Sequence, residues 1–341
     1  MKYLIVVAGP TASGKTGLGI KLAQHFNTSI LSADSRQFYR EMSVGTAKPT
    51  EEELAQAEHL FINNLSIHDE YSVGDYEREA IEALNNIYKE KDVAVMVGGS
   101  GLFIQAVCDG LNEFPEVSKE IREDLTKSYE KHGLWVLQKE LKEVDPEYYD
   151  FVDTNNSQRL IRALEIYRAS GQPYSSFRDQ DRKEREFTPI YIVLDWDRDE
   201  LYDKINLRVD VMMKDGLLKE IESLYDHKDL NALQTVGYKE FFAFKEGEYD
   251  VYEAIRLVKR NSRRYAKRQM TWFRKIEEAG FFHPTEMEDI LKFINIEMGL
   301  EEPEDEDEIG DEEEMEDDFD GIDEDMDDEI EDDEDEDSDE D

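Results

Sequence analysis

The sequence contains one cysteine, Cys108, among 341 residues, which excludes a disulfide within the chain and a cysteine-based zinc site. It also lacks a signal-peptide pattern and any apolar run near the length of a membrane span, about eighteen residues. We therefore expect a cytoplasmic protein that is neither secreted nor inserted in a membrane. A monomer is a separate expectation that does not follow from these absences.

Residues 301–341 have no lysine or arginine and contain 31 aspartates and glutamates. The net charge of the whole chain is −45, so residues 1–300 carry the remaining −14. A segment so acidic and so poor in apolar residues cannot bury enough surface to fold by itself. We expect this tail to be disordered, and the preceding 300 residues to form an α/β domain with an insertion.

A phosphate-binding motif follows the first predicted strand. Residues 2–8, KYLIVVA, are apolar and rich in β-branched side chains, as in a buried strand. The next eight residues, GPTASGKT, fit G-x-x-x-x-G-K-[ST], and a helical pattern begins at Gly17. An ordinary glycine-rich turn is the alternative, but every fixed position of the motif is filled in the required strand–turn–helix context. The motif predicts a diphosphate or triphosphate site formed by Gly9, Pro10, Thr11, Ala12, Ser13, Gly14, Lys15 and Thr16, with Thr16 able to bind Mg²⁺.

Short apolar runs separated by helical patterns predict the rest of the fold. We expect further buried strands at residues 28–32, 92–97 and 188–194. Helical patterns cover residues 17–25, 76–90 and 199–275, and the charged segment 116–181 is helical without any strand-like run. The prediction is an α/β fold, a P-loop NTPase-like parallel sheet core flanked by helices. The core would comprise residues 1–115 and 186–300, a helical insertion domain residues 116–185, and the disordered acidic tail residues 301–341.

Asp34 is the acidic residue at a predicted strand end. A nucleotide hydrolase needs a second acid there to hold Mg²⁺ and position water, but the strand at 92–97 is followed by Gly98 and Gly99. Asp34 lies instead just after the predicted strand 28–32, in the polar, loop-like stretch 33–49. It can ligate the metal indirectly, act as a general base on an acceptor, or simply cap the following turn.

A strongly basic helix lies near the end of the folded part. Residues 254–276 contain nine lysines and arginines and no acid. Spacings of three, four and seven place a subset on one face, with Tyr265, Trp272 and Phe273 interleaved. This subset is Arg256, Arg260, Arg263, Lys267 and Arg274. Cations with aromatics favour a nucleic-acid site over a solvated surface helix, which normally mixes charges of both signs.

A second helical face lies in the predicted insertion. Gln158 and Arg162 are four residues apart beside Arg159, while Leu160 and Ile161 face away. Such a face can contact a phosphate backbone or a base edge, and a salt-bridged helix explains it equally well.

Taken together, these motifs resemble the tRNA dimethylallyltransferase (tRNA isopentenyltransferase) family. The resemblance spans nearly all of residues 1–280 and preserves the family's order of motifs. The matching stretches are GPTASGKT, SADSRQFYREMSVGTAKP, YSVGDY, VGGSGLF, NSQRLIRALE, QTVGYKE and KRQMTWFR. Because the zinc-finger extension of eukaryotic relatives is absent, the chain resembles the bacterial type.

The resemblance implies transfer of a dimethylallyl group from dimethylallyl diphosphate to an adenosine of the tRNA anticodon stem-loop. The acceptor would be the exocyclic amine of the adenosine 3′-adjacent to the anticodon, in tRNAs reading codons that start with U, and diphosphate would be released. Residues 9–16 would hold the diphosphate with Thr16 on Mg²⁺, and Asp34 would be the general base. Ser100 would also be catalytic; it stands where the family often has threonine, as Phe103 stands where it often has tyrosine.

The resemblance also implies a set of tRNA-binding residues. They are Asp34, Ser35, Arg36, Gln37, Ser100, Arg122, Gln158, Arg159, Leu160, Ile161, Arg162, Gln234, Gly237, Tyr238, Lys239, Lys267, Arg268, Gln269, Trp272 and Arg274.

Other functions of a P-loop protein remain as alternatives. The main one is a small-molecule kinase using ATP, in which the basic helix would be structural. An isopentenyltransferase acting on free adenine nucleotides is disfavoured by the large RNA-facing segments. A non-catalytic NTPase switch is disfavoured because no acid follows the strand at 92–97.

Overall fold

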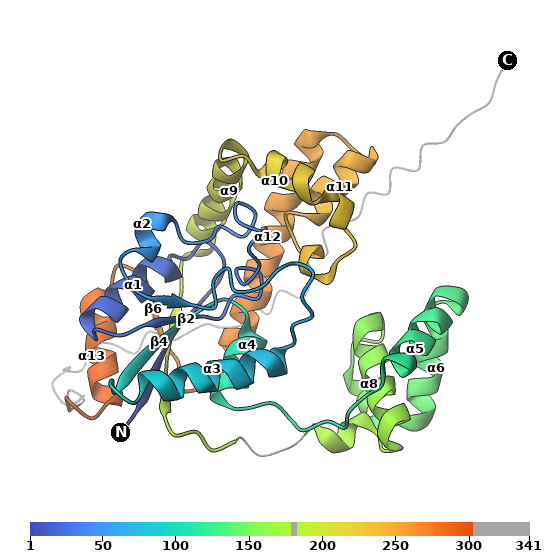
Figure 1. Cartoon of the computed structure of the whole chain (residues 1–341), viewed down its shortest axis with the longest axis horizontal. Helices are drawn as coiled ribbons and strands as arrows, with labels where there is room; N and C mark the ends of the chain where they lie inside the picture. The colour runs from blue at the N-terminus through green and yellow to red at the C-terminus, as the bar shows by residue number, and fades with distance from the viewer. Residues whose placement is uncertain (179–182, 303–341) are drawn as a thin grey trace, which may run out of the picture. The chain divides into compact units, whose positions relative to one another are not determined.

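The computed structural model describes residues 1–178 and 183–302, so the predicted acidic tail lies outside the described residues apart from its first two (Figure 1). Within that part, a six-stranded sheet forms the centre of the fold, with all neighbouring strands parallel and in the order β3-β2-β4-β1-β5-β6. The strands are β1 (Tyr3–Ala8), β2 (Ile30–Ser32), β3 (His59–Leu60), β4 (Val93–Val97), β5 (Thr188–Leu194) and β6 (Gly280–Phe282). The predicted α/β class is therefore confirmed.

Helices cover both faces of this sheet. The helices before the insertion are α1 (Lys15–His25), α2 (Glu51–Leu54), α3 (Val73–Ile87) and α4 (Gly101–Cys108). Those after it are α9 (Arg198–Lys214), α10 (Leu217–Leu224), α11 (Lys239–Glu246), α12 (Val251–Phe273) and α13 (Met287–Glu297). One face of the sheet packs with α3 and α4, and the other packs with α1 and α13. Both faces are thus dry, which explains why β1, β4 and β5 are continuous apolar runs.

The segment predicted to be helical, 199–275, contains four α-helices. Glycines with positive φ separate α9 from α10 at Gly216 (φ 101°) and α11 from α12 at Gly247 (φ 87°), a backbone region that favours glycine. Residues 225–238, which include two short 3₁₀ helices, separate α10 from α11. These breaks let α9, α10, α11 and α12 fold back on one another around a third apolar core.

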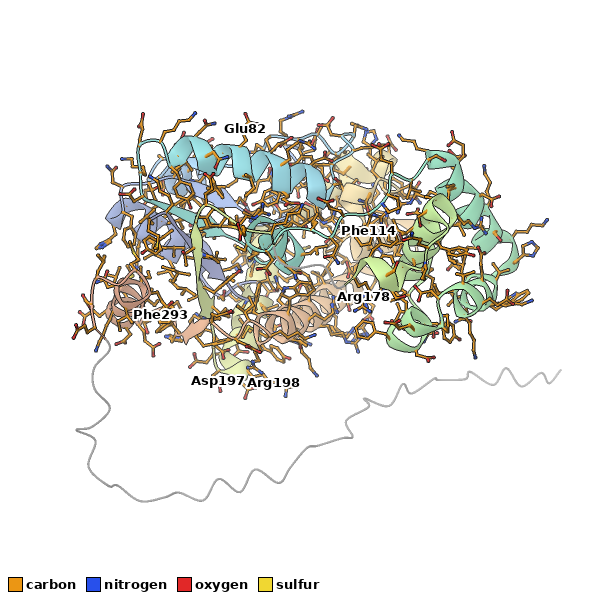
Figure 2. The ribbon with its side chains drawn as sticks, turned by 90° about the horizontal axis from the view of Figure 1, so that it is seen from below. Glu82, Phe114, Arg178, Asp197, Arg198 and Phe293 are labelled. Atoms are coloured by element: carbon orange, nitrogen blue, oxygen red, sulfur yellow. The ribbon has the colours of Figure 1, made fainter. Side chains whose placement is uncertain are left out.

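The insertion has an apolar core of its own. It consists of α5 (Lys119–His132), α6 (Trp135–Val144), α7 (Pro146–Phe151) and α8 (Ser157–Ser170), drawn in green in Figure 1. Its two connections lie close together, since Asn112 Nδ2 donates to the carbonyl of Arg178 at 2.7 Å. Phe114 on the first connection stacks on Tyr174, and both Phe114 and Arg178 are labelled in Figure 2. The division at residues 116 and 185 stays a prediction.

Candidate active site

Three loops meet at the carboxyl edge of the sheet, where ligands bind in open α/β folds. They follow β1, β2 and β4, which are adjacent in the order β2-β4-β1. Ser100 joins two of them, because its Oγ accepts a hydrogen bond from the backbone N–H of Ser35 at 3.1 Å. A Cβ on Gly98 would lie 2.3 Å from the carbonyl oxygen of Ala33, so only glycine permits this approach. The loop after β4 also approaches the P-loop, since a Cβ on Gly99 would lie 3.4 Å from the carbonyl oxygen of Gly9, so the two glycine-rich turns are neighbours.

The P-loop has the backbone of an anion site. Gly9 and Gly14 have φ of 145° and 93°, and α1 begins directly at Lys15 without a side-chain cap. The first N–H groups of this helix are thus available to a bound anion. The Ser13 Oγ is buried and has no hydrogen-bond partner among the described residues. A diphosphate oxygen would satisfy that orphaned hydroxyl.

Two cations converge behind this loop. Lys15 Nζ donates to the carbonyl of Pro10 at 2.6 Å. Burial, reinforced by the charge of Arg208 and opposed by that of Asp34, lowers the pKa of Lys15 to about 7. Arg208 donates through Nη2 to the carbonyl of Thr46 at 3.3 Å, and burial lowers its pKa as well. Two like charges held together in a dry site are an arrangement that a bound anion stabilises.

Sequence reasoning missed Arg208, although one signal was present. Asp197 caps the start of α9 by accepting from the N–H groups of Asp199 and Glu200, and Figure 2 labels Asp197 and its neighbour Arg198 there. The buried residues of α9 are Leu201, Ile205 and Val209. Arg208 lies three residues after Ile205 and next to Val209, so a charged side chain borders the apolar stripe.

Asp34 lies in the loop after β2 and lines one cavity together with Lys15 and Arg208. Its Oδ1 accepts from the N–H of Arg36 at 2.9 Å, so it does cap the turn. No donor among the described residues reaches its other oxygen, Oδ2. Asp34 also contributes to two cavities, and the turn-capping and chemical interpretations of this residue are therefore compatible.

The two cavities share part of their walls. One, of about 450 Å³, is lined by the P-loop and by Lys204 and Arg208. The other, of about 300 Å³, has an apolar side formed by Ile205, Val209, Met212, Leu217 and Val258. Four residues line both cavities, namely Thr11, Asp34, Arg208 and Tyr265. A space lined by the P-loop thus adjoins one with an apolar wall, called the apolar cavity below, with a carboxylate and a guanidinium at the junction.

Several residues predicted to bind tRNA make contacts within the chain. Gln269 is buried, where its Oε1 accepts from Thr11 N and its Nε2 donates to Gly99 O, both at 2.9 Å. It braces the P-loop against the second glycine turn and lines the cavity beside the P-loop, and its contact with tRNA stays a prediction. Tyr238 is buried under the loop after β2, and Leu160 and Ile161 form the core of the insertion, so these side chains pack within the chain.

Two loop residues near Asp34 are also held internally. Arg36 Nη1 donates to the carbonyls of Asn231 and Ala232 at 3.1 and 3.0 Å. Gln37 Nε2 donates to the carbonyl of Thr46 at 3.3 Å. Ser35 and Gly237 line the apolar cavity, while Gln234 and Lys239 are exposed.

Exposed cations remain on the insertion. Gln158, Arg159 and Arg162 are exposed on α8, as predicted from their spacing. The buried carboxylate of Glu165 lies 3.1 Å from Arg122 Nε and 3.4 Å from Arg162 Nη1. Glu165 therefore fixes two predicted RNA contacts from different helices.

On the basic face predicted on α12, some cations contact other side chains of the chain and others have no acidic partner among the described residues. Arg256 forms an ion pair with Glu253, and Arg263 donates to Asn206 Oδ1 at 2.7 Å. Trp272 and Arg274 are exposed, with Arg274 3.7 Å from Asp195. Three exposed cations have no acidic partner among the described residues: Arg264, Lys267 and Arg268.

Two properties of the described residues bear on ligands. No helix among them is both long and apolar enough to traverse a bilayer. Nor do they contain a group of three or more His, Cys, Asp or Glu side chains able to hold a metal ion. A cation at Thr16 would therefore take further ligands from a bound diphosphate.

Comparisons with known proteins agree on one family. Residues 37–276 match the family model described as IPP transferase. The tRNA dimethylallyltransferase of Christiangramia forsetii is 54% identical over 280 residues, covering 82% of this chain and 93% of the relative. The tRNA dimethylallyltransferase of Flavobacterium johnsoniae is 48% identical over 301 residues, covering 86% of this chain and 97% of the relative.

Solved structures show the same fold. The tRNA isopentenylpyrophosphate transferase of Bacillus halodurans superposes with a TM-score of 0.65 at 35% identity, over 88% of this chain and 97% of that one. A eukaryotic dimethylallyltransferase acting on tRNA superposes with a TM-score of 0.76 at 24% identity, over 90% and 82% of the two chains. At that identity the second likeness concerns the fold alone.

Proposed function

This chain belongs to the IPP transferase family, and from that membership we propose that it transfers a dimethylallyl group from dimethylallyl diphosphate to tRNA, releasing diphosphate. The acceptor is the exocyclic amine of the adenosine 3′-adjacent to the anticodon in tRNAs reading codons that start with U. The observation that supports this reaction is the junction of a phosphate-binding cavity with an apolar cavity at Asp34 and Arg208. The ATP-dependent kinase is set aside, because relatives over most of the chain are named tRNA dimethylallyltransferases.

The donor diphosphate binds in the P-loop. The N–H groups at the start of α1 and the Ser13 hydroxyl hold its oxygens, and Lys15 and Arg208 neutralise its charge. Thr16 is the residue that would hold Mg²⁺, which when bound adds positive charge to the departing diphosphate. The apolar side of the adjoining cavity accepts the five-carbon chain.

Asp34 accepts the proton of the adenine amine. A bond forms between the amine nitrogen and the C1 carbon of the donor while the C1–O bond breaks, and the electron pair leaves with diphosphate. The amine proton passes to Oδ2 of Asp34, since Oδ1 is bonded to the N–H of Arg36. The adenine must leave the anticodon-loop stack to reach this cavity, at a cost of about a few kcal/mol.

The exposed cations bind the anticodon stem-loop. Arg122 and Arg162, held by Glu165, contact its phosphates from the insertion. On α12, Lys267, Arg268 and Arg274 do the same, and Trp272 offers a stacking surface. We assign Gln158, Arg159, Gln234 and Lys239 to the same surface as exposed residues, and Ser35, Ser100 and Gly237 to the loops around the flipped base. A cytoplasmic monomer is the simplest form for an enzyme with this substrate.

The test is incubation of the purified chain with dimethylallyl diphosphate and an anticodon stem-loop carrying adenosine at the acceptor position. We expect mass spectrometry of the digested nucleosides to show that adenosine has gained one C5H8 unit. A stem-loop with inosine there lacks the exocyclic amine and is the matched control. The proposal fails if the adenosine stays unmodified, or if labelled γ-phosphate from ATP appears on an acceptor.

A further inference from the structure

Glu220 on α10 binds the loop that follows Asp34. Its Oε2 accepts from the N–H groups of Ser43 at 2.8 Å and Val44 at 2.7 Å. Its Oε1 accepts from the N–H of Gly45 at 2.9 Å and from the hydroxyl of Tyr238 at 2.6 Å. We propose that Glu220 is a positioning residue that fixes Arg208, and through it the donor diphosphate, by holding residues 43–46 in place. This inference rests on the proposed function for its choice of ligand.

The loop of residues 43–46, which Glu220 binds, contacts active-site residues through Thr46. The buried hydroxyl of Thr46 donates to the carbonyl of Met42 at 2.9 Å, which closes the loop on itself. The carbonyl of Thr46 accepts from Arg208 Nη2 and from Gln37 Nε2, each at 3.3 Å. Gly45 and Thr46 also line the apolar cavity beside Asp34. A shift of the loop would therefore move the acceptor that orients the Arg208 guanidinium.

The opposite side of the loop is fixed by Tyr238. This side chain is fully buried, and a Cβ on Gly45 would lie 2.6 Å from its ring, so the backbone rests directly on the aromatic face. Burial together with the charge of Glu220 raises the pKa of the Tyr238 hydroxyl, which therefore stays protonated and donates. Three consecutive backbone donors and one hydroxyl converge on one carboxylate, and such charge-assisted bonds are about twice as strong as neutral ones.

Glu220→Gln is an informative substitution because only one of the two terminal atoms of glutamine can accept a hydrogen bond. Each oxygen of Glu220 accepts from two donors, so in Glu220→Gln the Nε2 must face at least one backbone N–H. The side-chain volume barely changes. The variant therefore loosens the loop without creating a cavity.

The experiment measures pyrophosphate binding by calorimetry in the full chain, alongside the donor KM, kcat and thermal unfolding. We expect Glu220→Gln to weaken pyrophosphate binding and raise the donor KM by about tenfold, corresponding to one lost interaction of moderate strength. Tyr238→Phe, which removes one of the four donors, is expected to give a smaller effect in the same direction. Glu222→Gln is the matched control, since Glu222 is exposed on the same helix and pairs with Lys245 away from the loop.

A merely structural Glu220 would give a different pattern. In that case Glu220→Gln would lower the unfolding temperature but leave pyrophosphate affinity within twofold of the parent, and this outcome overturns the inference. If the parent chain fails to prenylate the stem-loop but Glu220→Gln still weakens pyrophosphate binding relative to Glu222→Gln, the proposed function is wrong and the positioning role holds. Both conclusions are thus separable.

Discussion

Donor binding should depend on pH through Lys15, whose pKa is lowered to about 7 by burial and by Arg208. The diphosphate binds the protonated amine more tightly, and the amine loses its proton as the pH rises through about 7. Affinity for pyrophosphate or dimethylallyl diphosphate should therefore fall above neutrality. A lysine with its ordinary pKa would stay charged throughout the range and would give no such fall in affinity.

The size of the effect follows from that pKa. If the neutral amine contributes nothing, the dissociation constant scales with one plus the ratio of neutral to protonated Lys15. It then increases about eightfold between pH 6.5 and pH 8. At pH 8 about 0.9 proton should be taken up for each diphosphate bound, because binding restores the charge on the amine. Arg208 stays charged and keeps some affinity for the diphosphate when Lys15 is neutral, so eightfold is the upper limit of the change.

Calorimetry in buffers of different ionisation enthalpy measures both quantities. Lys15→Met keeps the length of the side chain and removes the titrating amine, so its weaker binding should lack the part of the pH dependence that Lys15 contributes. Titration of the ligand's own phosphate groups affects both chains equally and cancels in the comparison. The parent should approach the affinity of this variant at high pH. A pH-independent dissociation constant in the parent, or an equal slope in Lys15→Met, would refute the assignment of the titration to Lys15.

Three further substitutions test the division of tasks. Asp34→Asn keeps the oxygen that caps the turn but cannot take a proton. It should lower the single-turnover rate by about 10²–10⁴ while pyrophosphate affinity stays near normal. A rate within tenfold of the parent would remove Asp34 from proton transfer. Arg208→Lys loses the forked guanidinium and should raise the donor KM by about tenfold or more with little change in stem-loop KM; a change confined to the stem-loop KM would contradict its placement. Replacing Arg264, Lys267 and Arg268 together with alanine should make the slope of log binding constant against log salt concentration shallower by about 2–3 for tRNA. An unchanged slope would make α12 an ordinary surface helix.

The parts of this fold that the sequence predicts are those set by local physics. The P-loop joins a buried strand to a helix through glycines, and β5 is a seven-residue apolar run, so neither depends on distant contacts for its pattern. β6 has only three residues, too few for any periodicity, and exists because residues 280–282 pair with β5. The breaks before α10 and before α12 arise at the single glycines Gly216 and Gly247 within otherwise helical sequence, where the propensity signal is weak.

The same limit applies to the candidate site, where the sequence predicts the residues placed by local structure and not those placed by packing. Its P-loop and Asp34 lie at strand ends, where chain order alone brings them to one edge of the sheet. Gln269 resembled a surface residue because its neighbours Lys267 and Arg268 are charged, yet packing of α12 on the loops buries it. Arg208 borders the apolar stripe of α9, but its place beside the P-loop depends on how α9 packs, which local sequence does not give.

The phosphate nest alone does not decide the chemistry, since any diphosphate satisfies its N–H groups and cations. The adjoining cavity makes the difference. A phosphoryl transfer needs a nucleophile directed at phosphorus, beside the P-loop itself. Here Asp34 also lines a second space, one wall of which is formed by Ile205, Val209, Met212 and further apolar side chains. Lys15 lines only the P-loop cavity, whereas Asp34 and Arg208 line both, so a carboxylate and a guanidinium stand where the two spaces meet. This arrangement supports the proposed attack at carbon, because the apolar wall can hold a hydrocarbon chain while the P-loop holds the diphosphate.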